Sequence, residues 1–130
     1  MDITQLAVKE TFTLHLKGAD GDLLYDGPED QGRAVTVTLY GPGSKAFARA
    51  QGAQNRRMVE RLKTKGKGNV DVVADRAEFL ADITERFTHL EYGALTGRDL
   101  ALKVYSDPAI GFIAEQVNAE CGDWANFTNR

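Results

Sequence analysis

The residues that resemble a phosphate-binding loop lie between a strand-like run and a helix-like run of the sequence. Gly41, Gly43, Ser44 and Lys45 stand where the free amides of a helix start could meet an anion. A nucleotide-binding loop needs a longer spacer between its first glycine and a Gly-Lys-Ser/Thr group. Here one residue separates the two glycines, and serine precedes lysine. We therefore interpret this segment as a turn between a strand and a helix.

Metal-binding and nucleophilic residues are few and widely spaced. His15, His89 and Cys121 are the imidazole and thiol donors, and they lack the short spacings of a metal site. Neither histidine has a recognisable catalytic partner, and no serine lies in a nucleophile-elbow pattern. The sequence thus predicts no catalytic, cofactor or metal residues, and we expect a protein that is not an enzyme. Cys121 is expected to be a small buried hydrophobe.

Positive charge is concentrated in one segment. Residues 45–68 hold 8 basic and 1 acidic side chains, against 3 and 7 in residues 1–44 and 5 and 11 in residues 69–130. The net charges are +7, −4 and −6, and this segregation predicts salt-sensitive self-association into a homo-oligomer, through the basic segment and an acidic surface.

On a helix with about 100° per residue, the basic side chains do not all share one face. Arg49, Arg56 and Lys63 form one column, and Arg57 and Arg61 lie beside it. No aromatic residues are interleaved for base stacking, so we expect a solvated or partner-facing helix and no nucleic-acid binding. The candidate partner-binding residues are Arg49, Arg56, Arg57, Trp124 and Phe127.

Hydrophobic periodicity predicts the elements that position these residues. Alternation predicts strands at residues 11–17, 23–25 and 34–40. Helical spacing predicts a basic helix at residues 44–64 and a core helix from Asn69 to about residue 90. The helical stripes comprise Phe47, Ala50, Gln54, Met58 and Leu62 or Arg61 in the first helix, and Val70, Val73, Ala77, Leu80, Ile83, Phe87 and Leu90 in the second.

The last 35 residues contain the clearest start and stop signals. Thr96 and Asp99 have the spacing of a capping box for a short helix that ends at Tyr105. Asp107 can cap the next helix, with Pro108 in its first turn and a stop at Gly122. Trp124 and Phe127 follow it, either as a plug over the core or as a docking motif for a partner.

The predicted fold class is α+β, with a small N-terminal antiparallel sheet of two or three strands packed with three or four C-terminal helices. We expect a single domain over residues 1–130. Within it, residues 1–43 are mainly strands, residues 44–67 form the basic helix and a linker, and residues 69–127 form the helical part.

This layout carries a family resemblance in its C-terminal half. The short helix ending in Tyr105, the turn Ser106-Asp107-Pro108, the helix of residues 110–117 and the closing Gly122-Asp123 with Asn126-Phe127 resemble the tail assembly chaperones of long-tailed bacteriophages. The resemblance extends over about the last 60 residues, and over the N-terminal half only in length and layout. It rests on order and spacing, because this family has no catalytic signature.

The resemblance implies a non-catalytic protein that binds the tape measure protein and keeps it soluble. It also implies help in recruiting tail tube subunits, and absence from the mature virion. The alternative is a structural tail or head–tail connector protein that is retained in the virion, with residues 18–32 contacting a neighbouring ring subunit. Since no apolar run could cross a bilayer and no export signal is visible, we expect no membrane association and a place in the host cell cytoplasm.

Overall fold

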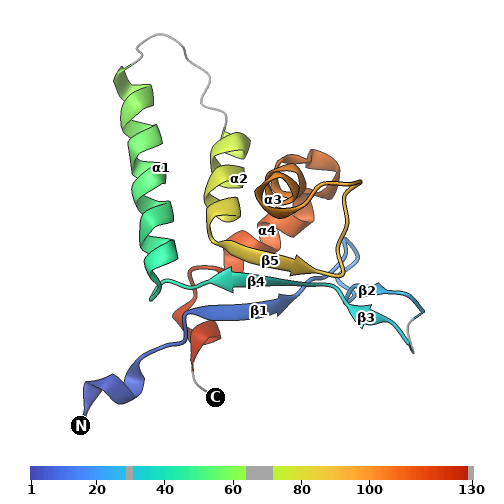
Figure 1. Cartoon of the computed structure of the whole chain (residues 1–130), viewed down its shortest axis with the longest axis horizontal. Coiled ribbons are helices and arrows are strands. Elements are labelled where there is room, and N and C mark those ends of the chain that lie inside the picture. Colours follow the sequence, from blue (N-terminus) through green and yellow to red (C-terminus); the bar gives the residue numbers. More distant parts are fainter. Residues whose placement is uncertain (29–30, 64–71, 129–130) are drawn as a thin grey trace.

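The fold is built on a three-stranded antiparallel sheet. A computed structural model describes residues 1–28, 31–63 and 72–128 of the 130. The sheet has the order β1 (Thr11–His15), β4 (Thr36–Tyr40), β5 (Thr84–Thr88), with β4 in the centre. Figure 1 shows the helices above this sheet and the N-terminal segment projecting below it. The predicted α+β class, with strands mainly N-terminal and helices mainly C-terminal, is confirmed.

The alternation of apolar and polar residues sets the two faces of the sheet. Leu14 lies opposite Val37, and Val37 lies opposite Phe87, so that these side chains share the face beneath the helices. On the other face Thr13 lies opposite Thr38, and their hydroxyl oxygens are 3.1 Å apart. Val37 and Leu39 are fully buried, which makes β4 the centre of the core.

The predicted strand at residues 23–25 does not join this sheet. Instead β2 (Tyr25–Asp26) pairs with β3 (Arg33–Ala34) in a separate two-stranded ribbon, seen at the right of Figure 1. The ribbon holds few apolar residues, and Tyr25 is exposed. A short run of apolar residues was insufficient to distinguish a central strand from a projecting ribbon.

Four α-helices occur in the described residues: α1 (Lys45–Lys63), α2 (Val72–Asp82), α3 (Gly97–Ser106) and α4 (Gly111–Glu120). The short 3-10 turns η1 (Ile3–Leu6), η2 (Pro108–Ile110) and η3 (Trp124–Phe127) complete the structure. Leu80, Val104, Ala114 and Val117 from α2, α3 and α4 form the helical side of the core. No helix in this part of the chain combines the length and the hydropathy that spanning a membrane requires.

The prediction of one core helix through residue 90 was wrong. α2 ends at Asp82, and β5 begins two residues later. The hydroxyl of Thr84 donates to the backbone oxygen of Leu80 at 2.7 Å, and the amide of Tyr40 donates to the oxygen of Ile83 at 2.7 Å. Since β4 offers a free edge here and this segment is rich in threonine, strand pairing prevails over the helical spacing of the apolar residues. Residues 64–71, which include most of the predicted linker and Asn69, lie outside the described residues.

The predicted helix caps were partly confirmed. Thr96 stands at the start of α3, but its side chain makes no capping hydrogen bond. The carboxylate of Asp107 accepts the amide of Ala109 at 2.9 Å, with Pro108 in the first turn, as predicted. That first turn is the 3-10 turn η2, so α4 itself begins at Gly111.

Gly41 is the place where the C-terminus closes onto the sheet. The ring of Phe127 lies directly against the α-carbon of Gly41 and packs edge-on against Phe12, with ring centroids 5.6 Å apart. The amide of Lys9 donates to the backbone oxygen of Phe127 at 2.7 Å. The segment at residues 41–45 is therefore a strand-to-helix turn filled by an aromatic ring.

We predict that Gly41→Ala destabilises the fold, because the added methyl group would overlap the ring of Phe127. Overpacking of this kind costs about 1–3 kcal/mol. Gly122→Ala is the matched control, since a methyl group there meets nothing within 4 Å. Thermal unfolding should show a lower melting temperature for Gly41→Ala alone, and equal melting temperatures for the two variants would contradict this packing.

A second prediction concerns the stability of the fold at low pH. The Tyr92 hydroxyl, which donates to the Asp107 carboxylate at 2.7 Å, is the main cause that lowers the pKa of Asp107, followed by the amide of Ala109. A lowered folded pKa stabilises the fold above the ordinary value of 3.8, and this contribution is lost as pH falls through the lowered pKa. Tyr92→Phe should therefore be less stable than the parent at pH 7, and denaturant titrations should show the gap narrowing towards pH 3. A gap that does not change with pH would rule out this linkage.

Candidate partner-binding surface

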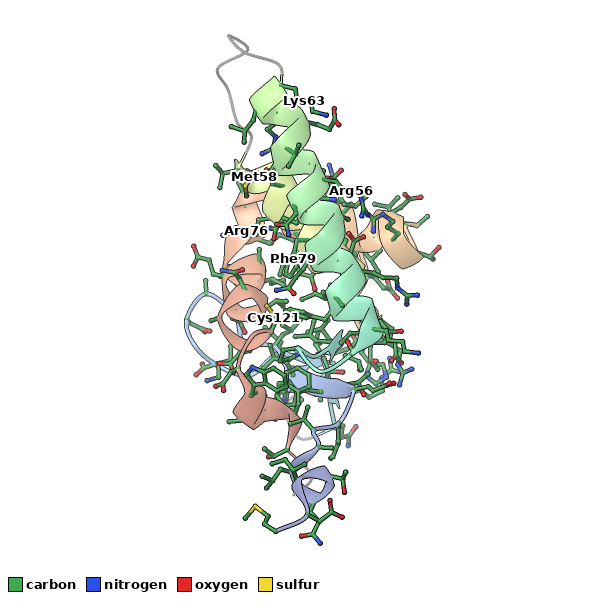
Figure 2. The ribbon with its side chains drawn as sticks, turned by 90° about the vertical axis from the view of Figure 1, so that its left-hand side faces the viewer. Arg56, Met58, Lys63, Arg76, Phe79 and Cys121 are labelled. Atoms are coloured by element: carbon green, nitrogen blue, oxygen red, sulfur yellow. The ribbon has the colours of Figure 1, made fainter. Side chains whose placement is uncertain are left out.

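Helix α1 projects from the body of the molecule. It has 19 residues, yet its buried residues, Phe47 and Ala50, lie near its first turns. The hydroxyl of Ser44 accepts the amide of Phe47 at 3.1 Å and so caps the helix start. Phe47 packs edge-on against Phe79 of α2, with ring centroids 5.6 Å apart. The rest of α1 extends beyond the sheet beside α2, as both views show (Figures 1 and 2).

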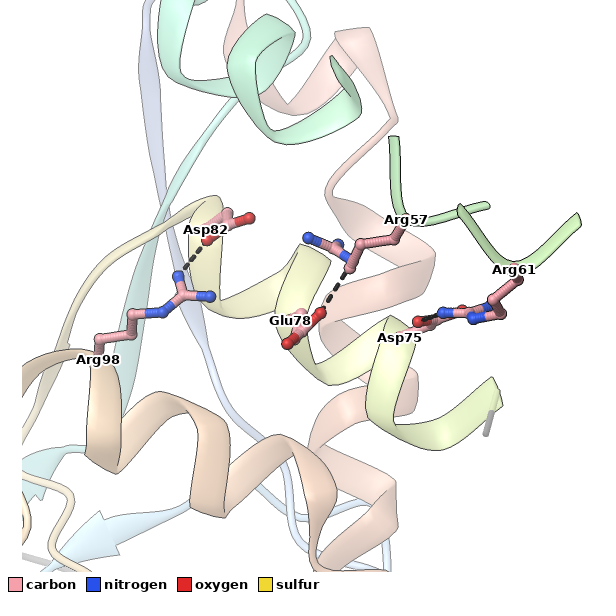
Figure 3. A network of polar contacts seen from close by, with 6 residues as sticks. All are labelled: Arg57, Arg61, Asp75, Glu78, Asp82 and Arg98. Carbon is pink, nitrogen blue, oxygen red and sulfur yellow. Dashed lines mark hydrogen bonds and ion pairs between the residues drawn. The ribbon is translucent and has the colours of Figure 1, made fainter. Parts of the chain in front are cut away.

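Ion pairs to α2 hold this projecting part. Arg57 Nε lies 2.8 Å from Glu78 Oε2, a charge contact whose N–H group is not aligned for a hydrogen bond, and Arg61 pairs with Asp75 (Figure 3). Such partly exposed pairs contribute roughly 0.2–1 kcal/mol each. Their larger effect is electrostatic, because they neutralise two of the basic side chains of α1 within the chain. Arg57, predicted to bind a partner, is thus engaged in an internal ion pair.

The other predicted cations are differently placed. Arg49 and Arg56 are exposed, and neither has a hydrogen bond or ion pair with any described residue. Together with Lys45 they line a hollow of about 640 Å³ beside α1. Glu10 and Asp82 lie on the same hollow, and Asp82 is already paired with Arg98 of α3 (Figure 3). The hollow therefore has an excess of unpaired positive charge.

Sequence reasoning missed an exposed apolar cluster at the far end of the two helices. The stripe of α1 with Met58, and Leu62 or Arg61, was predicted on a solvated or partner-facing helix, whereas Val73 was predicted on the apolar face of the core helix. In the structure Arg57 and Arg61 take the positions facing α2, and Met58 and Leu62 are exposed. We call this cluster the apolar tip; its residues are Met58, Val59, Leu62, Val72 and Val73. The missed signal was the presence of acidic residues on α2 at the spacing that pairs with Arg57 and Arg61.

The two C-terminal aromatic residues differ in their exposure to solvent. Phe127 is fully buried, whereas Trp124 is 56% exposed beside Gly43. The carboxylate of Asp123 accepts the amide of Ala125 at 3.0 Å and so caps the 3-10 turn η3, which contains both aromatic residues. Phe127 therefore corresponds to the plug that the sequence allowed, and Trp124 remains available to a partner.

The groups with chemical reactivity lie apart in the structure as well. Cys121 is buried as predicted, and burial raises the pKa of its thiol. Among the described residues, no three histidine, cysteine or carboxylate side chains gather where they could hold a metal ion.

No protein-family model matches this chain, and comparison with curated proteins and with solved structures yields no significant similarity.

We predict different effects for the two C-terminal aromatics. Phe127→Ala should cost about 3–5 kcal/mol, because it leaves a cavity next to Gly41 and Phe12. Trp124→Ala should cost about 1 kcal/mol or less, since its ring is largely exposed. Denaturant unfolding of the two variants measures this difference. Equal losses would show that Trp124 packs as tightly as Phe127.

Proposed function

We propose that this chain is a tail assembly chaperone of a long-tailed bacteriophage. In this role it has no catalytic activity, binds the tape measure protein, and helps to recruit tail tube subunits. It acts in the host cell cytoplasm as several associated copies, and it is absent from the mature virion. The resemblance of the C-terminal half to that family is the basis of the proposal.

The observation that supports partner binding most directly is the unequal use of the basic residues on α1. Arg57 and Arg61 are neutralised by α2, whereas Arg49 and Arg56 remain unpaired beside the hollow. Arg49 and Arg56 are seven residues apart, which is about two helical turns, so they point to the same side. A partner helix that lies along α1 and has carboxylates at the same spacing would complement both.

A long helical partner such as the tape measure protein can offer this arrangement repeatedly along its length. Each contact is exposed and individually weak, so binding gains strength from many copies along one partner. The self-association expected from the charge pattern would serve this purpose.

The alternative, a structural tail or head–tail connector protein, is favoured by a different observation. The β2–β3 ribbon projects from the body on the side away from α1 (Figure 1), as a loop that contacts a neighbouring ring subunit would. Mass spectrometry of purified phage particles separates the two functions. A chaperone is absent from the particles, and a connector or tail subunit is present in stoichiometric amount.

We predict that Arg49→Glu combined with Arg56→Glu abolishes capture of the tape measure protein when the two proteins are expressed together. The loss arises because four units of charge are changed where the partner's carboxylates would lie. The measurement is co-purification from nuclease-treated lysate, which removes nucleic acid as a bridge.

The matched control is Lys17→Glu combined with Arg33→Glu, which changes the net charge equally at a distance from α1. Arg33 is an exposed residue whose ion pair with Asp26 lies in the ribbon, so the control should remain folded and retain capture. Capture that survives the Arg49 and Arg56 changes, or is lost equally in both variants, would overturn the assignment of this surface.

A further inference from the structure

A second exposed apolar segment lies at the opposite end of the molecule from the apolar tip. Residues 1–7 form an arm that contains the turn η1, in which no residue is buried. Met1, Ile3 and Leu6 of the arm are at least 60% exposed. Figures 1 and 2 both place the arm below the sheet and the end of α1 at the top.

The arm is ordered at both of its ends. The Asp2 carboxylate accepts the amide of Thr4 at 3.0 Å and its hydroxyl at 2.7 Å, which closes the turn. At the other end, Lys9 is tied to Phe127, and Val8 lies against Gly43. Ile3 and Leu6 are three residues apart on this turn and so project to the same side. The arm thus presents a defined apolar face to solvent.

The apolar tip, like the arm, exposes apolar side chains to solvent. Leu62, near the end of α1, and Val72, at the start of α2, are about 70% exposed, and Met58, Val59 and Val73 of the same two helix ends are exposed as well. Exposed apolar side chains that gather in one place generally mark a contact surface. Because the arm and the tip lie at opposite ends, the arm of one chain cannot cover its own tip.

Charge distinguishes the possible pairings. Residues 55–63 and 72–78, which include the tip and the acidic partners of Arg57 and Arg61, have a net side-chain charge of +2, whereas the arm, residues 1–7, has −1. Pairing of two tips would place like charges together, and pairing of a tip with an arm would not. A contact between unlike ends is heterologous, and it continues from copy to copy as a ring or a filament.

We propose that the arm of one copy, through Ile3 and Leu6, docks on the apolar tip of the next copy, at Met58, Leu62 and Val72, so that the chains assemble head to tail. This inference specifies the self-association in the proposed function, and it is independent of the phage role. The contact is small compared with the roughly 1,200–2,000 Å² of a standard interface, so assembly should increase with protein concentration.

The test uses the purified full chain and two variants, each defective at one end. The arm variant is Ile3→Asp with Leu6→Asp, and the tip variant is Leu62→Asp with Val72→Asp. All four residues are exposed, so both variants should melt at the temperature of the parent. The control is Leu23→Asp with Leu95→Asp, which places the same charges on exposed apolar residues away from both ends.

Sedimentation equilibrium should show the parent and the control growing beyond the chain mass of 14.3 kDa as concentration rises, while each end variant alone associates at least tenfold more weakly. An equal mixture of the two end variants should form a dimer and nothing larger, because one good arm and one good tip remain. A mixture that stays monomeric would overturn the proposal, as would a parent that is monomeric at all concentrations. Capture of the tape measure protein by the monomeric variants is measured separately, so this inference and the proposed function can fail independently.

Discussion

Pairing of β4 with a strand on each side is the interaction on which the rest of the structure depends. β4 joins β1 from the first part of the chain to β5 from beyond α2, so it connects two strands that begin 73 residues apart in the sequence. Val37 and Leu39 then fix the face that α2, α3 and α4 must cover. The end of β4 leads into Gly41, where the ring of Phe127 closes the sheet. α2, α3 and α4 pack over this face of the sheet, whereas most of the longer helix α1 extends beyond it.

The sequence was informative where a local signal agreed with its surroundings. The cap at Asp107 formed as predicted because it involves neighbouring residues alone, and β4 formed at residues 36–40 of the predicted 34–40, where the alternation of apolar and polar residues itself favours a strand. The prediction failed at Thr84, where apolar residues at helical spacing met a free strand edge that only the folded sheet provides. Local periodicity contains no information about such an edge.

The same limit applies to the candidate surface. The sequence identified the basic side chains of α1, but only the packing of α2 shows that Arg57 and Arg61 are paired and that Arg49 and Arg56 are not. It likewise left Trp124 and Phe127 equivalent, whereas packing against Gly41 and Phe12 buries Phe127 and leaves Trp124 exposed. Whether a charged side chain is paired, and whether an aromatic ring is buried, both depend on contacts with residues that are distant in sequence.

We propose that α1 is a binding element whose outward face receives an acidic helical partner. Hydrogen–deuterium exchange of the chain with and without the tape measure protein tests it most directly, because exchange reports contact at each segment without altering a residue. We expect slower exchange on partner binding in residues 45–56 and at Trp124, and unchanged exchange in the β2–β3 ribbon. Slower exchange in the ribbon alone, with α1 unaffected, would contradict the claim.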